Sequence, residues 1–250
     1  MKNKKEISAG IIVIGNEVLS GRTLDTNTST ISVWLNSLGI KVDEVRIIPD
    51  VKKKIVDTVN ELRKKYKYVF TTGGIGPTHD DITASSISKA FNLKYGPHKE
   101  AMMILKKYYK PGEFNDGRQK MAWMPFEANL ILNPTSGAPG FNVENVFCLP
   151  GVPSILKSML GGISHKLSGG KPILSHTINL KTVESEIAKS LTIVQDKNKD
   201  VEIGSYPFFK SGKLGVAIVL RSSEQNKIDK CKLEIIKFVK KKNIKIVGKD

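Results

Sequence analysis

The segment from residue 68 to residue 83, YVFTTGGIGPTHDDIT, limits what this chain can fold into more than any other stretch. It opens with the apolar run Tyr68, Val69 and Phe70, which predicts a buried strand. It ends in two adjacent carboxylates, Asp80 and Asp81, just before a helical pattern. The glycines between them let the backbone adopt positive φ and turn several N–H groups toward one anion. The segment therefore predicts a phosphate-binding turn between a strand and a helix.

Asp80 and Asp81 indicate a metal as well as a phosphate. Two carboxylates cannot face a phosphate unless a positive charge lies between them, and an all-oxygen site suits Mg²⁺ or Mn²⁺. The positions expected to bind the phosphate through backbone amides or hydroxyl groups are Gly73, Gly74, Gly76, Thr71, Thr72 and Thr78. The alternative is an ordinary strand-to-helix connection, in which Asp81 caps the helix and the glycines only form a turn.

Polar residues also follow the two strands that the apolar runs at residues 7–14 and 40–48 predict. These strand-end positions are Gly15, Glu17, Asn27 and Asp50. Open α/β sheets bind their ligands at the carboxyl ends of the strands, so we expect these residues in the same site as the glycine-rich turn. The alternatives are an exposed loop acid for Glu17 and a helix N-cap for Asp50.

A third loop, NPTSGAPGF at residues 133–141, has small residues around Ser136 and Gly137. Small residues allow close approach to a ligand, although a plain surface turn explains the same composition. The order of the predicted elements up to Thr71 is βαβαβ, and the first strand is apolar on both faces. This pattern predicts an α/β fold with a mostly parallel sheet.

A second, smaller domain is expected after a glycine-rich boundary at residues 161–171, GGISHKLSGGK. We place the first domain at residues 1–165 and the second at residues 171–250. The tail reads as β-α-β-β-α-β, the order of a ferredoxin-like, split βαβ module. It carries no acid, histidine or glycine loop that indicates catalysis.

Composition and charge exclude several classes of protein. No window of about 18 apolar residues predicts a transmembrane helix, and the lysine-rich start MKNKKEISAG lacks the apolar region of a secretory signal, so a cytoplasmic protein is expected. The net charge of +16 raises the question of nucleic acid, but it is mostly lysine on predicted helix faces without interleaved aromatic residues. Nucleic-acid binding is therefore not expected. Cys148 and Cys231 are interpreted as packed thiols.

The loops GNEVLSG, TTGGIGPTHDDIT, NPTSGAPGF and LPGVP together resemble the MoaB/Mog molybdopterin-binding domain, in the form found at the N-terminus of the CinA (competence and damage-inducible) proteins. The resemblance covers about residues 7–165, and the tail looks like the small domain that follows in CinA. It implies a three-layer αβα fold whose loops surround one phosphate-bearing ligand. CinA proteins often continue into a nicotinamide-nucleotide deamidase domain; because this sequence ends at Asp250, deamidation is not expected.

The resemblance also implies an activity. In the molybdenum-cofactor enzymes the ligand is molybdopterin, whereas CinA-type domains are linked to metal-dependent hydrolysis of ADP-ribose, and a related domain of FAD synthases is linked to FAD hydrolysis. Asp50 and Asp81 match acids that matter in the Mog enzymes, and the three glycines match the phosphate loop. The positions that match the CinA pattern are Glu17, Asn27, Asp80, Ser136 and Gly137. Family analogy further implies a homo-oligomer.

These observations lead to two hypotheses. The first is a metal-dependent nucleotide pyrophosphatase that uses Mg²⁺, Mn²⁺ or Co²⁺, with the metal held by Asp81 together with Asp50 or Asp80. In it, Glu17 or Asp50 orients or deprotonates the attacking water, and the residues do not decide between them. The second is a non-catalytic pterin or nucleotide binder, or a relative of the molybdopterin adenylyl-transfer enzymes.

Overall fold

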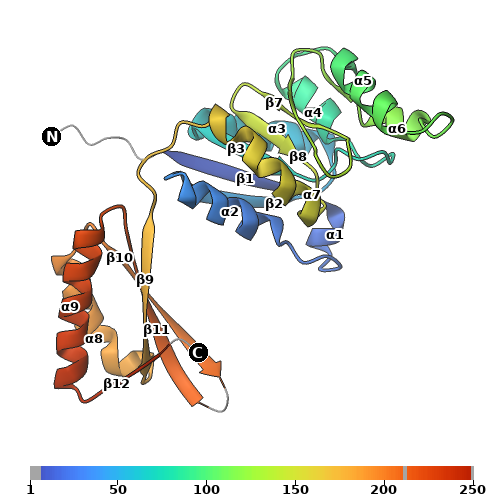
Figure 1. Ribbon diagram of the computed structural model, residues 1–250. Coiled ribbons are helices and arrows are strands. Elements are labelled where there is room, and N and C mark those ends of the chain that lie inside the picture. The colour runs from blue at the N-terminus through green and yellow to red at the C-terminus, as the bar shows by residue number, and fades with distance from the viewer. Residues whose placement is uncertain (1–6, 211–212, 249–250) are drawn as a thin grey trace. The chain divides into compact units, whose positions relative to one another are not determined.

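The chain divides into two units, the first ending at Gly170 and the second beginning at Lys171. The computed structural model (Figure 1) describes residues 7–210 and 213–248. Each unit has its own hydrophobic core, so each is described separately.

A six-stranded sheet forms the centre of the first unit, in the order β2-β1-β3-β8-β7-β6. The strands β2, β1, β3 and β8 run parallel, and β7 runs antiparallel to both of its neighbours. Parallel strands end at the same edge of a sheet, so the loops after these four strands lie together. The strands are β1 (Ser8–Ile14), β2 (Lys41–Ile48), β3 (Tyr68–Thr72), β6 (Asn129–Ile131), β7 (Gly140–Val143) and β8 (Val146–Leu149).

Helices cover both faces of this sheet, which confirms the predicted three-layer αβα fold (Figure 1). Along β1, Ile11 and Val13 pack with α2 and α7 on one face, while Ile12 and Ile14 pack with α3, α4 and α5 on the other. Alternate residues of a strand point to opposite faces, so an apolar run in which every residue is buried requires both layers. The helices are α2 (Asn27–Ser37), α7 (Pro153–Leu160), α3 (Lys52–Lys65), α4 (Thr83–Ala90) and α5 (Lys99–Tyr108).

A long connection joins β3 to β8, although the two strands are neighbours in the sheet. It contains α4, α5, β6 and β7, and in addition a short helix and a two-stranded antiparallel sheet. These further elements are α6 (Asp116–Lys120), β4 (Tyr95–Pro97) and β5 (Trp123–Pro125). A shorter helix, α1 (Asn16–Leu19), follows β1.

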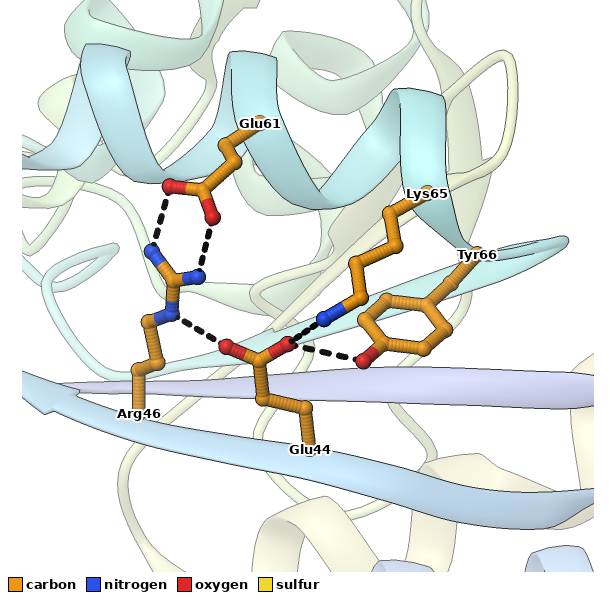
Figure 2. A network of polar contacts seen from close by, with 5 residues as sticks. All are labelled: Glu44, Arg46, Glu61, Lys65 and Tyr66. Atoms are coloured by element: carbon orange, nitrogen blue, oxygen red, sulfur yellow. Dashed lines mark hydrogen bonds and ion pairs between the residues drawn. The ribbon is translucent and has the colours of Figure 1, made fainter.

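The edge strand β2 carries a network of charged side chains (Figure 2). Glu44 accepts hydrogen bonds from Lys65 Nζ (2.7 Å), the Tyr66 hydroxyl (2.7 Å) and Arg46 Nε (2.6 Å), and Arg46 also donates to Glu61. The hydrogen bonds from Lys65, Tyr66 and Arg46 lower the pKa of Glu44 to about 2. Charged side chains on an edge strand oppose pairing with another chain, and here they also join β2 to α3.

The glycine-rich stretch expected as a boundary belongs partly to the first unit. Residues Gly161–Lys166 form a 3₁₀ helix whose Ile163 is buried in the core beside α7. The Tyr68 hydroxyl then accepts a hydrogen bond from Ser168 N (2.7 Å). The first unit therefore runs to Gly170, because two apolar residues among the glycines, Ile163 and Leu167, pack against its core.

The second unit has the predicted β-α-β-β-α-β order, in an antiparallel sheet ordered β10-β11-β9-β12. The helices pack on one face, where Ile187 and Val194 of one helix and Ile228 and Ile235 of the other join the core. The elements are β9 (Leu174–Lys181), α8 (Glu184–Lys197), β10 (Glu202–Lys210), β11 (Lys213–Ser222), α9 (Gln225–Lys241) and β12 (Lys245–Val247). Both cysteines, Cys148 in the first unit and Cys231 in the second, are buried thiols, as predicted.

None of the helices within residues 7–210 and 213–248 has the length and apolar character needed to cross a membrane.

Candidate functional site

Backbone hydrogen bonds hold the carboxyl ends of the four parallel strands together. Gly15 N donates to Ile48 O (3.2 Å), which joins the ends of β1 and β2, and Gly73 N donates to Leu149 O (3.1 Å), which joins β3 and β8. Gly73 has a φ of +100°. A Cβ at this position would lie 2.2 Å from Ile14 O, a backbone atom that cannot move aside. Only glycine therefore permits this close approach of the β1 and β3 ends.

The turn after Gly73 is fixed by the first residue of α4. Gly74 has a φ of +68°, and its carbonyl accepts a hydrogen bond from Thr83 N (2.9 Å). Thr83 Oγ1 donates to Gly73 O (2.9 Å). A Cβ on Gly74 would lie 2.2 Å from Thr83 Oγ1. Successive glycines at positive φ, tied to a helix start, form a turn of the kind that holds anions in other proteins.

The two aspartates of the segment are organised by Thr78. The Thr78 hydroxyl lies 2.6 Å from both Asp80 Oδ1 and Asp81 Oδ2, and Thr78 N donates to Asp81 Oδ2 (2.8 Å). The hydrogen bond from Thr78 is the main reason why the pKa of Asp80 is lowered. Asp81 does not cap α4, because Ile82 is the N-cap residue and the helix has no side-chain cap. The alternative in which Asp81 only caps a helix is therefore wrong.

Asp50 lies close to the other predicted acids. Its Oδ2 accepts a hydrogen bond from Asn16 N (2.9 Å), and Val51 rather than Asp50 is the N-cap residue of α3. Burial raises the pKa of Asp50, the bond from Asn16 opposes this, and the nearby charges of Glu17, Asp80 and Asp81 raise it further. Four carboxylates from three strand-end loops thus share one electrostatic environment.

Asn27 and Thr72 connect the start of α2 with the ends of β3 and β8 through hydrogen bonds. Asn27, the first residue of α2, is buried, and its Nδ2 donates to Thr72 Oγ1 (2.8 Å) and to Gly151 O (2.7 Å). Thr72 Oγ1 in turn lies 3.1 Å from Pro150 O. Both side chains were predicted to contact a ligand, and this stays a prediction. Their described hydrogen bonds connect α2 with the end of β3 and with the turn that follows β8.

Ser136 and Gly137 belong to a loop arranged around Asn133. Asn133 Oδ1 accepts from Ser136 N (3.0 Å), and Asn133 Nδ2 donates to Ser136 Oγ (2.7 Å). Gly137 has a φ of +74° and packs against Tyr108 of α5. The described contacts of these two residues are therefore with their own loop and with α5, not with the acids. Pro139, later in the same loop, does reach the pocket described next.

A shallow pocket, open to solvent, lies beside the glycine-rich turn. Its lining includes Gly74, Gly76, Asp81, Lys120, Trp123 and Phe141. Lys120 Nζ donates a hydrogen bond to Thr78 O, in the same turn. The sequence did not single out Lys120 because nothing distinguishes it among the 40 lysines and arginines of the chain.

The residues present fit a metal that is bound together with a phosphate. Within the described part of the chain, no three His, Cys, Asp or Glu side chains form a group that could hold a metal by themselves. Asp80 and Asp81 are adjacent oxygen donors, and Mg²⁺ is commonly held by one or two carboxylates, waters and substrate phosphates. The donor set therefore suits a hard divalent cation that arrives with an anionic ligand.

Comparisons with known proteins agree with this architecture. Residues 10–175 match the family described as "Probable molybdopterin binding domain", and residues 172–247 match the "FAD synthase, middle domain". A protein of Archaeoglobus fulgidus is 36% identical over 217 residues (87% of this chain, 92% of that protein), and one of Saccharolobus islandicus is 34% identical over 253 residues (94% and 95%).

Among solved structures, the CinA protein of Thermoplasma acidophilum, described as of unknown function, is 31% identical with a TM-score of 0.60. The match covers 64% of this chain and 96% of that chain. The predicted resemblance is thereby confirmed. The chain belongs to the molybdopterin-binding domain family of the MoaB/Mog type and is CinA-like.

Proposed function

We propose that this protein is a metal-dependent nucleotide pyrophosphatase that hydrolyses the diphosphate of ADP-ribose or of a similar dinucleotide. One observation carries the proposal: Glu17, Asp50, Asp80 and Asp81 come from three strand-end loops and lie close enough for three of them to raise the pKa of Asp50. They adjoin a turn of glycines at positive φ. An anion-binding turn beside clustered carboxylates suits a ligand that carries both phosphate and metal.

The glycine-rich turn and the acids have separate tasks in this proposal. The backbone amides around Gly74 and Gly76 bind the phosphoryl oxygens and stabilise the charge that develops on them. Asp80 and Asp81 would hold the metal, which when bound would neutralise the diphosphate and act as a Lewis acid. Mg²⁺, Mn²⁺ and Co²⁺ are the candidates.

Asp50 is assigned as the general base. Burial is the main cause of its raised pKa, and a raised pKa makes a carboxylate a better proton acceptor near neutral pH. Asp50 accepts a proton from water, the water oxygen bonds to one phosphorus, and the bridging P–O bond breaks, which releases AMP and ribose 5-phosphate from ADP-ribose. Glu17, after the neighbouring strand, orients the water.

The direct test is to incubate the purified protein with ADP-ribose and Mg²⁺, Mn²⁺ or Co²⁺ and to measure AMP. Replacing Asp50 by Asn should reduce the rate by at least about 100-fold, as expected for the loss of a general base. Asp81→Asn should raise the metal concentration needed for half-maximal rate. Asp57→Asn is the matched control, because Asp57 is an exposed carboxylate on α3 that pairs with Lys53. The absence of AMP with all three metals would refute the proposal.

FAD is the second dinucleotide to test, because residues 172–247 resemble the middle domain of FAD synthase. Cleavage of FAD at the diphosphate would also yield AMP, together with FMN. If the protein cleaves FAD faster than ADP-ribose, the proposed reaction type stands and FAD replaces ADP-ribose as the proposed substrate.

The second candidate function is binding of a pterin or nucleotide without cleavage. The family match favours it, since a molybdopterin-binding domain needs the phosphate turn but no hydrolytic base. Mass spectrometry of ligand that copurifies with the protein separates the two. A bound pterin would support the second candidate, and a bound adenine dinucleotide or AMP would support the first. We also propose a homo-oligomer, which light scattering after size-exclusion chromatography would test.

A further inference from the structure

The pocket beside the glycine-rich turn combines a cation with the proposed metal-binding acid. Lys120 and Asp81 both line it, and among its lining residues, all within the described part of the chain, Lys120 is the only lysine or arginine. The lysine comes from α6, in the long connection between β3 and β8, and not from a strand-end loop. A separate element of the fold therefore brings a positive charge to the acidic site.

The hydrogen bonding of Lys120 leaves its ammonium group able to bind an anion. Its described hydrogen bond is to the carbonyl oxygen of Thr78, a neutral acceptor. The same Thr78 binds Asp81 through its N–H and its hydroxyl. An ammonium group has three donors, and a charge-assisted bond to a phosphate oxygen is stronger than a bond to a neutral carbonyl.

The charge of the site favours such a group. A diphosphate diester carries two negative charges, and Asp81, the acid that lines the pocket, and the adjacent Asp80 add two more. One divalent metal balances only half of this total. A fixed cation on the wall of the pocket would reduce the remaining repulsion over the few ångströms that separate the groups.

We propose that Lys120 binds the diphosphate of the ligand in this pocket and so provides a cation independent of the metal. The inference rests on the proposed function for the kind of ligand, but not on its hydrolysis. On binding, Lys120 Nζ moves from Thr78 O to a phosphoryl oxygen. Asp80 and Asp81 would hold the metal, which when bound would neutralise further charge of the diphosphate.

The test measures binding without catalysis. ADP-ribose and inorganic pyrophosphate are titrated by calorimetry, in EDTA and again with Ca²⁺, into the wild type and into Lys120→Met, which keeps the apolar stem of the side chain. We expect Lys120→Met to weaken both probes by about ten- to a hundredfold, the effect of removing one charged hydrogen bond. Lys120→Arg should restore part of the affinity. Lys107→Met, at an exposed lysine of α5, is the control and should change it by less than about twofold.

Salt dependence distinguishes binding of the ligand from a purely structural role. Between ~50 and ~300 mM salt, the affinity of the wild type should fall more steeply than that of Lys120→Met, because the variant lacks one phosphate contact. Equal slopes, with lower affinity and a lower melting temperature for Lys120→Met, would show that the lysine only supports the turn and would overturn the inference.

The remaining outcomes separate this inference from the proposed function. Unchanged affinity in Lys120→Met would overturn the inference even if ADP-ribose is hydrolysed. Loss of affinity in the variant, with no hydrolysis by the wild type under any metal, would retain the lysine site and refute the pyrophosphatase. If Lys120→Met loses ADP-ribose binding but keeps pyrophosphate binding, then Lys120 contacts a part of ADP-ribose other than the diphosphate, and the inference is overturned. Absence of binding of either probe to the wild type would also overturn it.

Discussion

Replacing Asn27 by Asp tests the hydrogen bonds that hold the site together, since the two side chains have almost the same shape. The amide group of Asn27 donates to Thr72 Oγ1 (2.8 Å) and to Gly151 O (2.7 Å), and the residue is 6% exposed. A carboxylate has no proton to donate and would direct negative charge at both oxygens. The substitution therefore converts two attractive contacts into repulsive ones without creating a cavity.

The magnitude follows from three contributions. Losing two neutral hydrogen bonds costs about 2 kcal/mol. A buried, unpaired carboxylate adds about 2 to 4 kcal/mol at neutral pH, or it remains protonated with a raised pKa. The position at the start of α2 offsets this by about 0.5 to 1 kcal/mol through the helix dipole. We expect a net loss of about 3 to 5 kcal/mol at pH 7.5. For Asn27→Ala the loss should be about 1 to 2 kcal/mol, because this variant also removes Asn27 Oδ1, which has no hydrogen-bond partner among the described residues.

The pH dependence provides the decisive comparison. The introduced carboxyl group has a folded-state pKa above its unfolded value of about 3.9, so the destabilisation increases as the pH rises above that value. Asn27→Asp should therefore lose less stability at pH 4.5 than at pH 7.5, whereas the effect of Asn27→Ala should be equal at both. Urea unfolding followed by tryptophan fluorescence measures the first unit alone, because the two tryptophans of the chain, Trp34 and Trp123, both lie in it. A variant Asn27→Asp as stable as the wild type at pH 7.5 would refute the reasoning.

Three further predictions follow from the described contacts. Glu44→Gln should lower the free energy of unfolding by about 1 kcal/mol at pH 7, as expected for a charged network that is partly exposed. Because the pKa of Glu44 in the folded state is lowered to about 2, the difference from the wild type should disappear as the pH falls from about 4.5 through about 2. Urea unfolding at several pH values checks this. Asp50→Asn should raise the melting temperature while reducing the rate of ADP-ribose hydrolysis by at least about 100-fold. The neutral amide avoids burying a charge beside other carboxylates and still accepts the hydrogen bond from Asn16 N, so a lower melting temperature would contradict this. Gly74→Ala should destabilise the first unit by about 1 to 3 kcal/mol and weaken pyrophosphate binding, because the φ of Gly74 is +68° and the new Cβ would meet Thr83 Oγ1. The control is Gly162→Ala, which should have little effect because a Cβ at Gly162 meets no atom within 4 Å.

Much of the fold was predictable because local pattern and tertiary structure agree. The apolar run of β1 is buried on both faces, and apolar residues that recur every three or four positions in α8 and α9 pack in the core of the second unit. The convergence of the loops after β1, β2 and β3 also follows from topology, since parallel strands end at one edge. Sequence alone therefore placed Glu17, Asp50, Asp80 and Asp81 near one another, although their roles remain predictions.

The contacts of individual polar side chains were harder to predict. Asn27 and Thr72 were expected at a ligand, and nothing in the sequence indicated that Asn27 Nδ2 and the Thr72 hydroxyl also donate to Gly151 O and Pro150 O, because those carbonyl groups lie far away in the chain. Ser136 was likewise expected at a ligand, and its described hydrogen bond is with Asn133. Lys120 could not be identified, because its place near Thr78 depends on how the long connection between β3 and β8 folds back, and helical periodicity within that connection does not give its path.

Substitutions in that long connection and substitutions in the strand-end loops have different consequences for the sheet. The acids and glycines belong to loops fixed by the central sheet, where a substitution disturbs the packing of several strands at once. Lys120 and Trp123 belong to residues 95–125 of the excursion between β3 and β8, and this segment contributes no strand to the six-stranded sheet. The pocket wall can therefore be altered while the strand-end loops stay constant, and engineered libraries aimed at new ligands should randomise Lys120, Trp123 and other residues of 95–125 that lie outside the core before any strand-end loop.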